Sequence, residues 1–192
     1  MWTNWSGELS CTPAREVRCA TAEEVTEAVV AGPGPVRVAG AGHSFTPLVL
    51  TGGTLLRLDG LSGVQDADPG SGLVRLGAGT TIARANELLD ELGLALENLG
   101  DIDVQALAGA IATATHGTGG AKPSISAQVE ALELVAADGT VHPCSREDDV
   151  DLWRAARVSL GALGVLTSVT VRTVPAFTLR RVDAQEPLDD VL

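Results

Sequence analysis

The feature that most restricts the fold of this chain is a short apolar strand that runs directly into a glycine-flanked histidine. The strand covers residues 36–39, and the sequence Gly-Ala-Gly-His-Ser follows it over residues 40–44. Glycine takes positive φ without steric cost, so successive backbone N–H groups can turn inward here and form an anion-binding concavity. Ser44 adds a hydroxyl donor, and the loop therefore suits a diphosphate. A plain strand-to-turn connection with an incidental histidine is the alternative that these residues leave open.

Alternating helix and strand patterns surround this loop in the first half of the chain. Thr21 and Glu24 have the spacing of a capping box, which predicts a helix that ends at the Gly-Pro-Gly-Pro stretch over residues 32–35. A second helix is expected from Thr80 or Thr81 to Gly93. Further strands are predicted over residues 54–58, 64–67 and 73–76.

The second half of the chain predicts a run of small residues, a hairpin, a helix and a last strand. The small residues cover 106–114 and lead to a second glycine-flanked histidine, His116, which suggests a wall for a flat ligand; a tightly packed core helix is the alternative. Asp138-Gly139 predicts a hairpin between strands at residues 129–135 and 140–144. Ser145 is expected to cap the next helix, and the last strand is expected over residues 165–174.

The charge balance restricts the possible partners and the compartment. The net charge of −12 comes without any basic run, which argues against nucleic acid or an anionic membrane as partner. The three cysteines have no metal-ligand spacing, and no metal site is expected. The amino terminus lacks the pattern of a signal peptide, and no apolar stretch reaches the ~18 residues of a membrane span. These features predict a cytoplasmic protein with reduced thiols.

Five motifs, taken together, resemble a known family. In this order and spacing the motifs are similar to the amino-terminal FAD-binding (PCMH) domain of vanillyl-alcohol oxidase-type flavoproteins, in particular the L-gulono-1,4-lactone, D-arabinono-1,4-lactone and alditol oxidases. The five motifs cover residues 3–7, 40–46, 98–103, 114–119 and 159–165.

This resemblance implies an α+β fold in which two α/β subdomains hold FAD between them. The subdomains are expected at about residues 10–95 and 96–180 of a single FAD-binding domain over residues 1–192. The chain indeed lacks the G-x-G-x-x-G sequence of the Rossmann fold. The resemblance also implies that His43 is joined covalently to the flavin, and a His43 that only hydrogen-bonds the cofactor is the alternative.

The family pattern also implies which residues of this chain would contact the cofactor. Residues of the glycine loop would surround the diphosphate, Gly100 and Asp101 would lie near the isoalloxazine ring, and Val165 would contact the adenine end. The full expected set is Val38, Ala39, Gly40, Ala41, Gly42, His43, Ser44, Gly100, Asp101, Ala106, Gly109, Ala110, Ile111, Ala112, Thr113, His116 and Val165. In relatives the residue at the place of Gly100 controls oxygen access, so glycine here predicts an oxidase.

Some residues near these motifs keep two interpretations. His116 would lie near the flavin or a phosphate, or it would be a buried loop histidine bonded to backbone. Asp101 and Asp103 would act as an acid/base pair, or they would belong to a flavin-facing loop. Lys122 would meet a phosphate or be solvated, and Trp5 is expected to be a packing residue.

The implied activity is an FAD-dependent oxidation of sugar lactones or polyols, with hydride passing from a substrate C–H to flavin N5. We expect the substrate-binding cap to be absent, because the family continues beyond the position of Leu192, so no catalytic residue is assigned to this chain. A partner chain would then supply the cap. The alternatives are a non-catalytic flavin- or nucleotide-binding module that needs a partner, and an anion-binding α+β domain without flavin.

Overall fold

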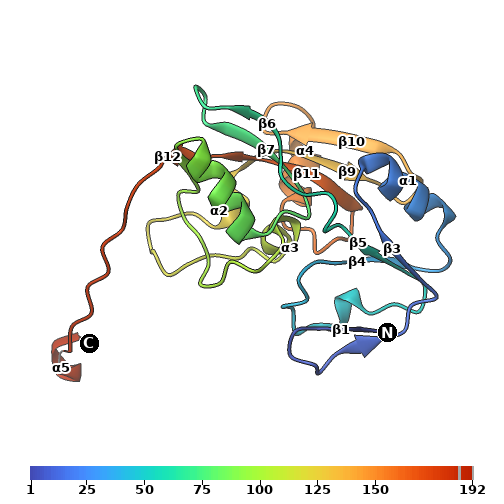
Figure 1. Cartoon of the computed structure of the whole chain (residues 1–192), viewed down its shortest axis with the longest axis horizontal. Coiled ribbons are helices and arrows are strands. Elements are labelled where there is room, and N and C mark those ends of the chain that lie inside the picture. Colours follow the sequence, from blue (N-terminus) through green and yellow to red (C-terminus); the bar gives the residue numbers. More distant parts are fainter. Residues whose placement is uncertain (186, 192) are drawn as a thin grey trace.

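The computed structural model describes residues 1–185 and 187–191 as an α+β fold (Figure 1). The helices are α1 (Ala22–Ala31), α2 (Ile82–Glu91), α3 (Leu107–Ala112), α4 (Val150–Ala156) and α5 (Leu188–Val191), with 3-10 turns η1 (Pro47–Val49) and η2 (Ile125–Gln128). The strands are β1 (Trp2–Thr3), β2 (Ser10–Cys11), β3 (Arg15–Arg18), β4 (Val36–Ala39), β5 (Thr54–Arg57), β6 (Val64–Asp68), β7 (Leu73–Gly77), β8 (Leu94–Ala95), β9 (Val129–Val135), β10 (Val141–Ser145), β11 (Val165–Arg172) and β12 (Val174–Pro175). No helix among the described residues has the length and apolar character that a membrane crossing requires.

A parallel sheet of order β3-β5-β4 carries the amino-terminal part of the chain. Helix α1 connects β3 to β4, and the predicted cap at its start is confirmed: Thr21 Oγ1 accepts from Glu24 N–H at 3.2 Å. The Glu24 carboxylate reaches back one residue further than a standard capping box, to Ala20 N–H at 2.7 Å. Strand β4 therefore enters the sheet in a fixed direction and ends at Ala39, directly before the glycine loop.

An antiparallel sheet of order β10-β9-β11-β7-β6 forms the larger layer. Strand β11 pairs with β7 on one side and with β9 on the other, so Val169 lies opposite both Leu76 and Leu132. The predicted hairpin at residues 138–139 is confirmed by the pairing of β10 with β9. Because β6 and β7 precede residue 95 and the other strands follow it, this sheet is continuous across that point, and the division into subdomains near residue 95 stays a prediction.

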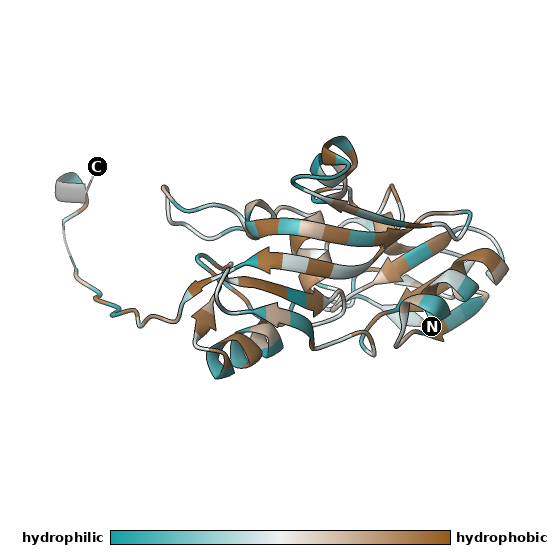
Figure 2. Ribbon diagram, turned by 90° about the horizontal axis from the view of Figure 1, so that it is seen from above, coloured by the Kyte–Doolittle hydropathy of each residue, from teal (hydrophilic) through white to brown (hydrophobic). Residues whose placement is uncertain are grey.

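One hydrophobic core joins the two sheets. Helices α1, α2 and α3 each contribute fully buried side chains to it, among them Val25, Leu89 and Ile111. Leu56 of β5 and Leu132 of β9 belong to the same cluster, and each fully buried leucine contributes ~1.5–3 kcal/mol relative to an exposed one. Figure 2 shows hydrophobic residues recurring along the strands in the middle of the molecule. After β12 the chain leaves this body, and α5 lies apart from it (Figure 1).

Two expected boundaries are wrong: the start of the helix after β10 and the end of the last long strand. Ser145 does not cap a helix, because it is still paired with Ala131 in the β10–β9 ladder. Its hydroxyl accepts from Asp148 N–H at 2.9 Å, while Asp149 caps α4. The strand expected over residues 165–174 is interrupted at Thr173, whose N–H and hydroxyl both donate to Gly72 O at 2.7 Å.

Candidate cofactor site

The glycine loop over residues 40–44 leaves the carboxyl end of β4, the end of a parallel strand at which ligands are commonly bound. Gly42 takes φ +76°, a conformation that side chains disfavour. A Cβ on Gly42 would also lie 3.3 Å from Trp2 Cζ2, while a Cβ on Gly40 would lie 3.3 Å from Ala106 Cβ. Both glycines therefore let the loop pass close to neighbouring segments.

Backbone donors of this loop are left free. Among the described residues of the chain, the N–H groups of residues 40–45 donate no hydrogen bond. Ala41 and Ser44 are exposed, and Gly42 and His43 are half-buried. Successive unused donors at the surface form the kind of concavity that binds anions, so the loop fits a diphosphate by the chemistry of its donors. The Ser44 hydroxyl is partly engaged, since its oxygen lies 3.0 Å from Thr46 Oγ1.

The amino-terminal segment lies against the same loop. The backbone N–H of Trp5 donates to Gly42 O at 2.9 Å, and Asn4 Nδ2 donates to Ser44 O at 3.2 Å. The Trp5 ring stacks on His43 with centroids 5.1 Å apart and planes at 24°. The expectation that Trp5 is a packing residue is wrong, because its side chain is 68% exposed.

Helix α3 brings the small-residue run to the glycine loop. Leu107 N–H donates to Thr80 O at 2.8 Å and Ala108 N–H to Ala78 O at 3.1 Å, which fixes the start of α3 beside the β7–α2 connection. Ala106 of this segment faces Gly40 across the contact described above. The structure therefore brings together the glycine loop and the small-residue run, the two segments that the sequence analysis selected as cofactor-binding.

The expected contact residues of α3 divide into two groups. Ala110 and Ile111 are fully buried in the core, so neither exposes an atom to a ligand at the surface. Gly109 and Thr113 are exposed, and Ala112 is half-buried. This division is that of a helix with one face in the core and the other toward the surface. The core-helix interpretation holds for the buried face, and the wall for a flat ligand stays a prediction for the exposed face.

A second pair of segments flanks α3. A Cβ on Gly100 would lie 2.8 Å from Thr115 Cγ2, and a Cβ on Gly117 would lie 2.5 Å from Leu99 O. Beneath these loops Gln105 Nε2 donates to Thr115 Oγ1 at 3.3 Å, while Gln105 Oε1 is buried and has no partner among the described residues. A buried acceptor without a donor is costly, so a bound group that donates a hydrogen bond fits beside Gln105.

The residues with two interpretations are placed as follows. His116 is exposed rather than buried, and its Nδ1 lies 2.8 Å from Gly117 O. Asp101 and Asp103 are both exposed in the loop that precedes α3. Lys122 pairs with Glu97 at 2.9 Å, so its charge is already matched.

Val165 lies at the start of β11, with its side chain buried. It is opposite Val135 in the sheet, and the nearby Thr167 O accepts from Ala78 N–H at 3.1 Å. Ala78 O also accepts from Ala108 N–H, so this part of β11 is linked through Ala78 to the start of α3, and the contact of Val165 with the adenine end stays a prediction. Its own side chain is directed away from solvent.

A second glycine pair was missed by the sequence analysis. Gly77 ends β7 and Gly79 follows it, and a Cβ on Gly79 would overlap Leu58 O, so only glycine fits there. The signal was present in the sequence, because the strand-Gly-Ala-Gly pattern of residues 36–42 recurs at residues 73–79. The β7–α2 connection that contains Gly79 lies beside the start of α3, because Ala78 O and Thr80 O accept from its backbone.

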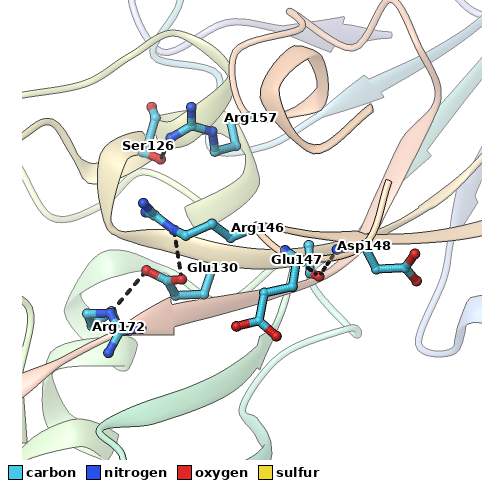
Figure 3. Close-up of polar contacts among 8 residues, drawn as sticks. Ser126, Glu130, Arg146, Glu147, Asp148, Arg157 and Arg172 are labelled. Atoms are coloured by element: carbon cyan, nitrogen blue, oxygen red, sulfur yellow. Dashed lines mark hydrogen bonds and ion pairs between the residues drawn. The ribbon is translucent and has the colours of Figure 1, made fainter. Parts of the chain in front are cut away.

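A separate hollow of about 320 Å³ lies next to Glu97 and Gln128. Its arginines Arg146 and Arg172 both donate through Nε to Glu130, at 2.9 and 3.0 Å (Figure 3). Glu130 is the shared partner of both arginines, while Glu97 pairs with Lys122. The network ties β9, β11 and the segment after β10 together.

Comparison with known proteins identifies an FAD-binding domain. The family model described as "FAD binding domain" matches residues 13–145. L-gulono-1,4-lactone dehydrogenase of Mycobacterium tuberculosis is 43% identical over 195 aligned residues, which cover 100% of this chain and 45% of that protein. Alditol oxidase of a Streptomyces species is 38% identical, covering 91% of this chain and 42% of that protein. L-gulonolactone oxidase of Mus musculus is 34% identical, with 98% and 44% covered.

Solved structures share the fold. Chitooligosaccharide oxidase has a TM-score of 0.78 at 22% identity over 90% of this chain and 38% of its own. The 6-hydroxy-D-nicotine oxidase of Arthrobacter nicotinovorans has a TM-score of 0.74 at 22% identity over 85% of this chain and 37% of its own. The predicted PCMH-type α+β fold is confirmed. The chain spans less than half the length of these relatives.

Proposed function

The chain belongs to the FAD binding domain family, and we propose that it holds FAD with its diphosphate at the glycine loop and its ring system beside α3 and the loop of Gly100. The free N–H groups of residues 40–45 are the observation that carries this proposal. The buried, unpaired Gln105 Oε1 supports it, because it needs a donor. In this proposal two subdomains, about residues 10–95 and 96–180, lie on either side of the cofactor.

We propose that the reaction is the oxidation of a sugar lactone or polyol. When bound, FAD supplies the acceptor for a hydride from the substrate C–H. The residues of this chain bind and orient it: the glycine loop neutralises phosphate charge, and the exposed face of α3 supplies a flat wall of small side chains. We assign substrate recognition and removal of the substrate proton to the part of such enzymes that this chain does not cover.

We propose further that His43 forms the covalent link to the flavin. Among the described residues, neither ring nitrogen of His43 takes part in a hydrogen bond, so both are available to a cofactor. A neutral imidazole nitrogen is a good nucleophile toward an electrophilic carbon. The free cysteines Cys11, Cys19 and Cys144 suit a reducing compartment, and we propose the cytosol.

Acid precipitation of the purified yellow protein tests cofactor and tether together. We expect a flavin spectrum, with the colour in the pellet for the wild-type chain and in the supernatant for His43→Ala. His142→Ala is the matched control, because His142 lies in β10 outside the site. Colour in the supernatant for wild type would remove the tether and keep FAD. A colourless protein after addition of FAD, folded by circular dichroism, would contradict the flavoprotein proposal.

A partner-dependent flavin module is the second candidate function. Exposed apolar side chains near the glycine loop favour it, notably Phe45 and Leu48, because an exposed apolar surface marks an interaction site. In that case the chain alone would bind FAD but give little or no turnover with L-gulono-1,4-lactone. Robust turnover by the isolated chain would exclude this candidate.

A further inference from the structure

We propose that Asn4 and Trp5 form an amino-terminal clamp, a pair of positioning residues that sets the glycine loop and the His43 ring in the conformation that receives the cofactor. This inference rests on the proposed function. It adds a third segment, far from the other two in sequence, to the site made by residues 40–45 and α3.

Asn4 is anchored before it reaches the loop. Its side chain is 5% exposed, and its Oδ1 accepts from Leu9 N–H at 3.0 Å and from Ser6 Oγ at 3.3 Å. The adjacent β1–β2 hairpin is fixed by Trp2, which packs in a small core with Ala39. With Oδ1 occupied, Asn4 Nδ2 is directed to Ser44 O at 3.2 Å.

Trp5 contacts the loop in two ways. Its backbone N–H donates to Gly42 O at 2.9 Å, and its indole ring stacks on His43. Since Trp5 as a residue is 68% exposed, burial contributes little to holding its ring there. The stack is therefore the main contact of this side chain, and its partner is the proposed flavin ligand.

The two hydrogen bonds also orient the free donors of the loop. In a planar trans peptide the C=O of one residue and the N–H of the next point in opposite directions. Because the clamp holds Gly42 O and Ser44 O, it turns His43 N–H and Phe45 N–H away from the amino-terminal segment. These are two of the donors that remain unused in the chain as described.

The clamp thus acts on both parts of cofactor binding. It directs backbone donors of the loop, and it restrains a ring that no hydrogen bond among the described residues restrains. Loss of the stack should free the His43 ring, whereas loss of the Asn4 donor should loosen the loop. The two effects can be measured separately.

The first test uses the apo protein, with diethyl pyrocarbonate as probe and mass spectrometry of the His43 peptide as readout. We expect Trp5→Ala to raise the modification rate of His43 by about 2- to 10-fold, the range of an aromatic pair. Trp5→Phe should stay near wild type, because it keeps a stacking ring. Phe177→Ala, which removes another exposed aromatic side chain far along the chain, should also stay near wild type.

The second test measures FAD binding and the acid-stable fraction. Asn4→Asp keeps the acceptor for Leu9 N–H and removes the donor to Ser44 O, and we expect about tenfold weaker FAD binding. Trp5→Ala should retain FAD with a smaller acid-stable fraction. If wild type takes up no FAD, the proposed function fails and His43 reactivity alone decides the clamp. Variants Trp5→Ala and Asn4→Asp that match wild type in reactivity and FAD binding would overturn it.

Discussion

The methyl group of Thr115 lies where a side chain on residue 100 would have to go. A Cβ built on Gly100 would be 2.8 Å from Thr115 Cγ2, closer than real Cβ contacts allow. Thr115 is not free to turn away, because its Oγ1 lies 3.3 Å from Gln105 Nε2 and 3.4 Å from Thr113 Oγ1. Packing therefore disfavours any side chain at position 100, whatever glycine contributes to oxygen access.

Substitution of this glycine should strain the loop, and a second substitution should relieve the strain. We expect Gly100→Ala to lower the free energy of unfolding by ~1–3 kcal/mol, the usual cost of overpacking. In Gly100→Ala/Thr115→Ser the clashing methyl group is absent and the hydroxyl remains, so most of the loss should be recovered. Urea denaturation of the variants, with Thr115→Ser alone as control, measures the coupling. Strict additivity of the two changes would show that the contact carries no energy.

The same pair of variants separates oxygen access from packing. If Gly100 keeps a path to the flavin open, the FAD-loaded, reduced wild-type chain should be reoxidised by dissolved oxygen. Gly100→Ala should slow this reaction, and the double variant should remain slow although its stability has recovered. Stopped-flow absorbance at the flavin band follows the reaction. Reoxidation of the wild type only by dyes would contradict the oxidase prediction.

The conformation of Gly42 should matter for FAD more than for stability. Ala at φ +76° costs ~1–2 kcal/mol, and the added Cβ would also meet Trp2 Cζ2 at 3.3 Å. Gly93 has nearly the same φ, +71°, at the end of α2, with nothing close to a Cβ. We therefore expect Gly42→Ala to lose at least as much stability as Gly93→Ala in thermal unfolding, while only Gly42→Ala loses FAD. Equal FAD retention would place the diphosphate elsewhere.

Gln128 should stabilise the loop that contains Gly100, because its side chain bonds the backbone just before that glycine. It is 4% exposed, its Oε1 accepts from Glu97 N–H at 2.9 Å, and its Nε2 donates to Asn98 O at 2.9 Å. Gln128→Met keeps the length and leaves both backbone groups unpaired, which should cost ~1–3 kcal/mol in urea denaturation. Gln65→Met, at an exposed position of β6, is the matched control and should change little. A Gln128→Met variant as stable as this control would show that water replaces both bonds.

Local signals in the sequence predicted most elements, and long-range contacts explain the errors. Thr21 caps α1 and Asp138-Gly139 forms a hairpin because neighbours in sequence decide both. Ser145 failed as a cap because its pairing with Ala131 is set by another strand. The glycine loop was found from its own residues.

The structural partners of the glycine loop could not be found from those residues. Asn4 and Trp5 lie about forty positions away in sequence from the residues they hold, and no local pattern encodes that contact. The fit of Gly79 against Leu58 is likewise a property of the folded chain. The sequence thus located the segments that we propose to face the cofactor, and not the contacts that position them.

The cysteines should differ sharply in reactivity. Burial raises the pKa of the Cys19 thiol, with Glu24 adding to the effect, and burial also raises the pKa of Cys144, with a smaller contribution from Asp149. Since the thiolate is the reactive form, both thiols should react slowly with Ellman's reagent at neutral pH. The half-buried Cys11 should react first.

The dependence on denaturant distinguishes burial from chemistry in this experiment. Cys19 and Cys144 are almost fully buried, so the reagent reaches them only when the chain opens. Their rates should therefore rise with sub-denaturing urea, whereas the rate of Cys11 should hardly change. Cys11→Ser, which should remove the fast phase alone, assigns it. Three equal rates in the native protein would contradict the burial of Cys19 and Cys144, and with it the packing of α1 and α4 on which that burial depends.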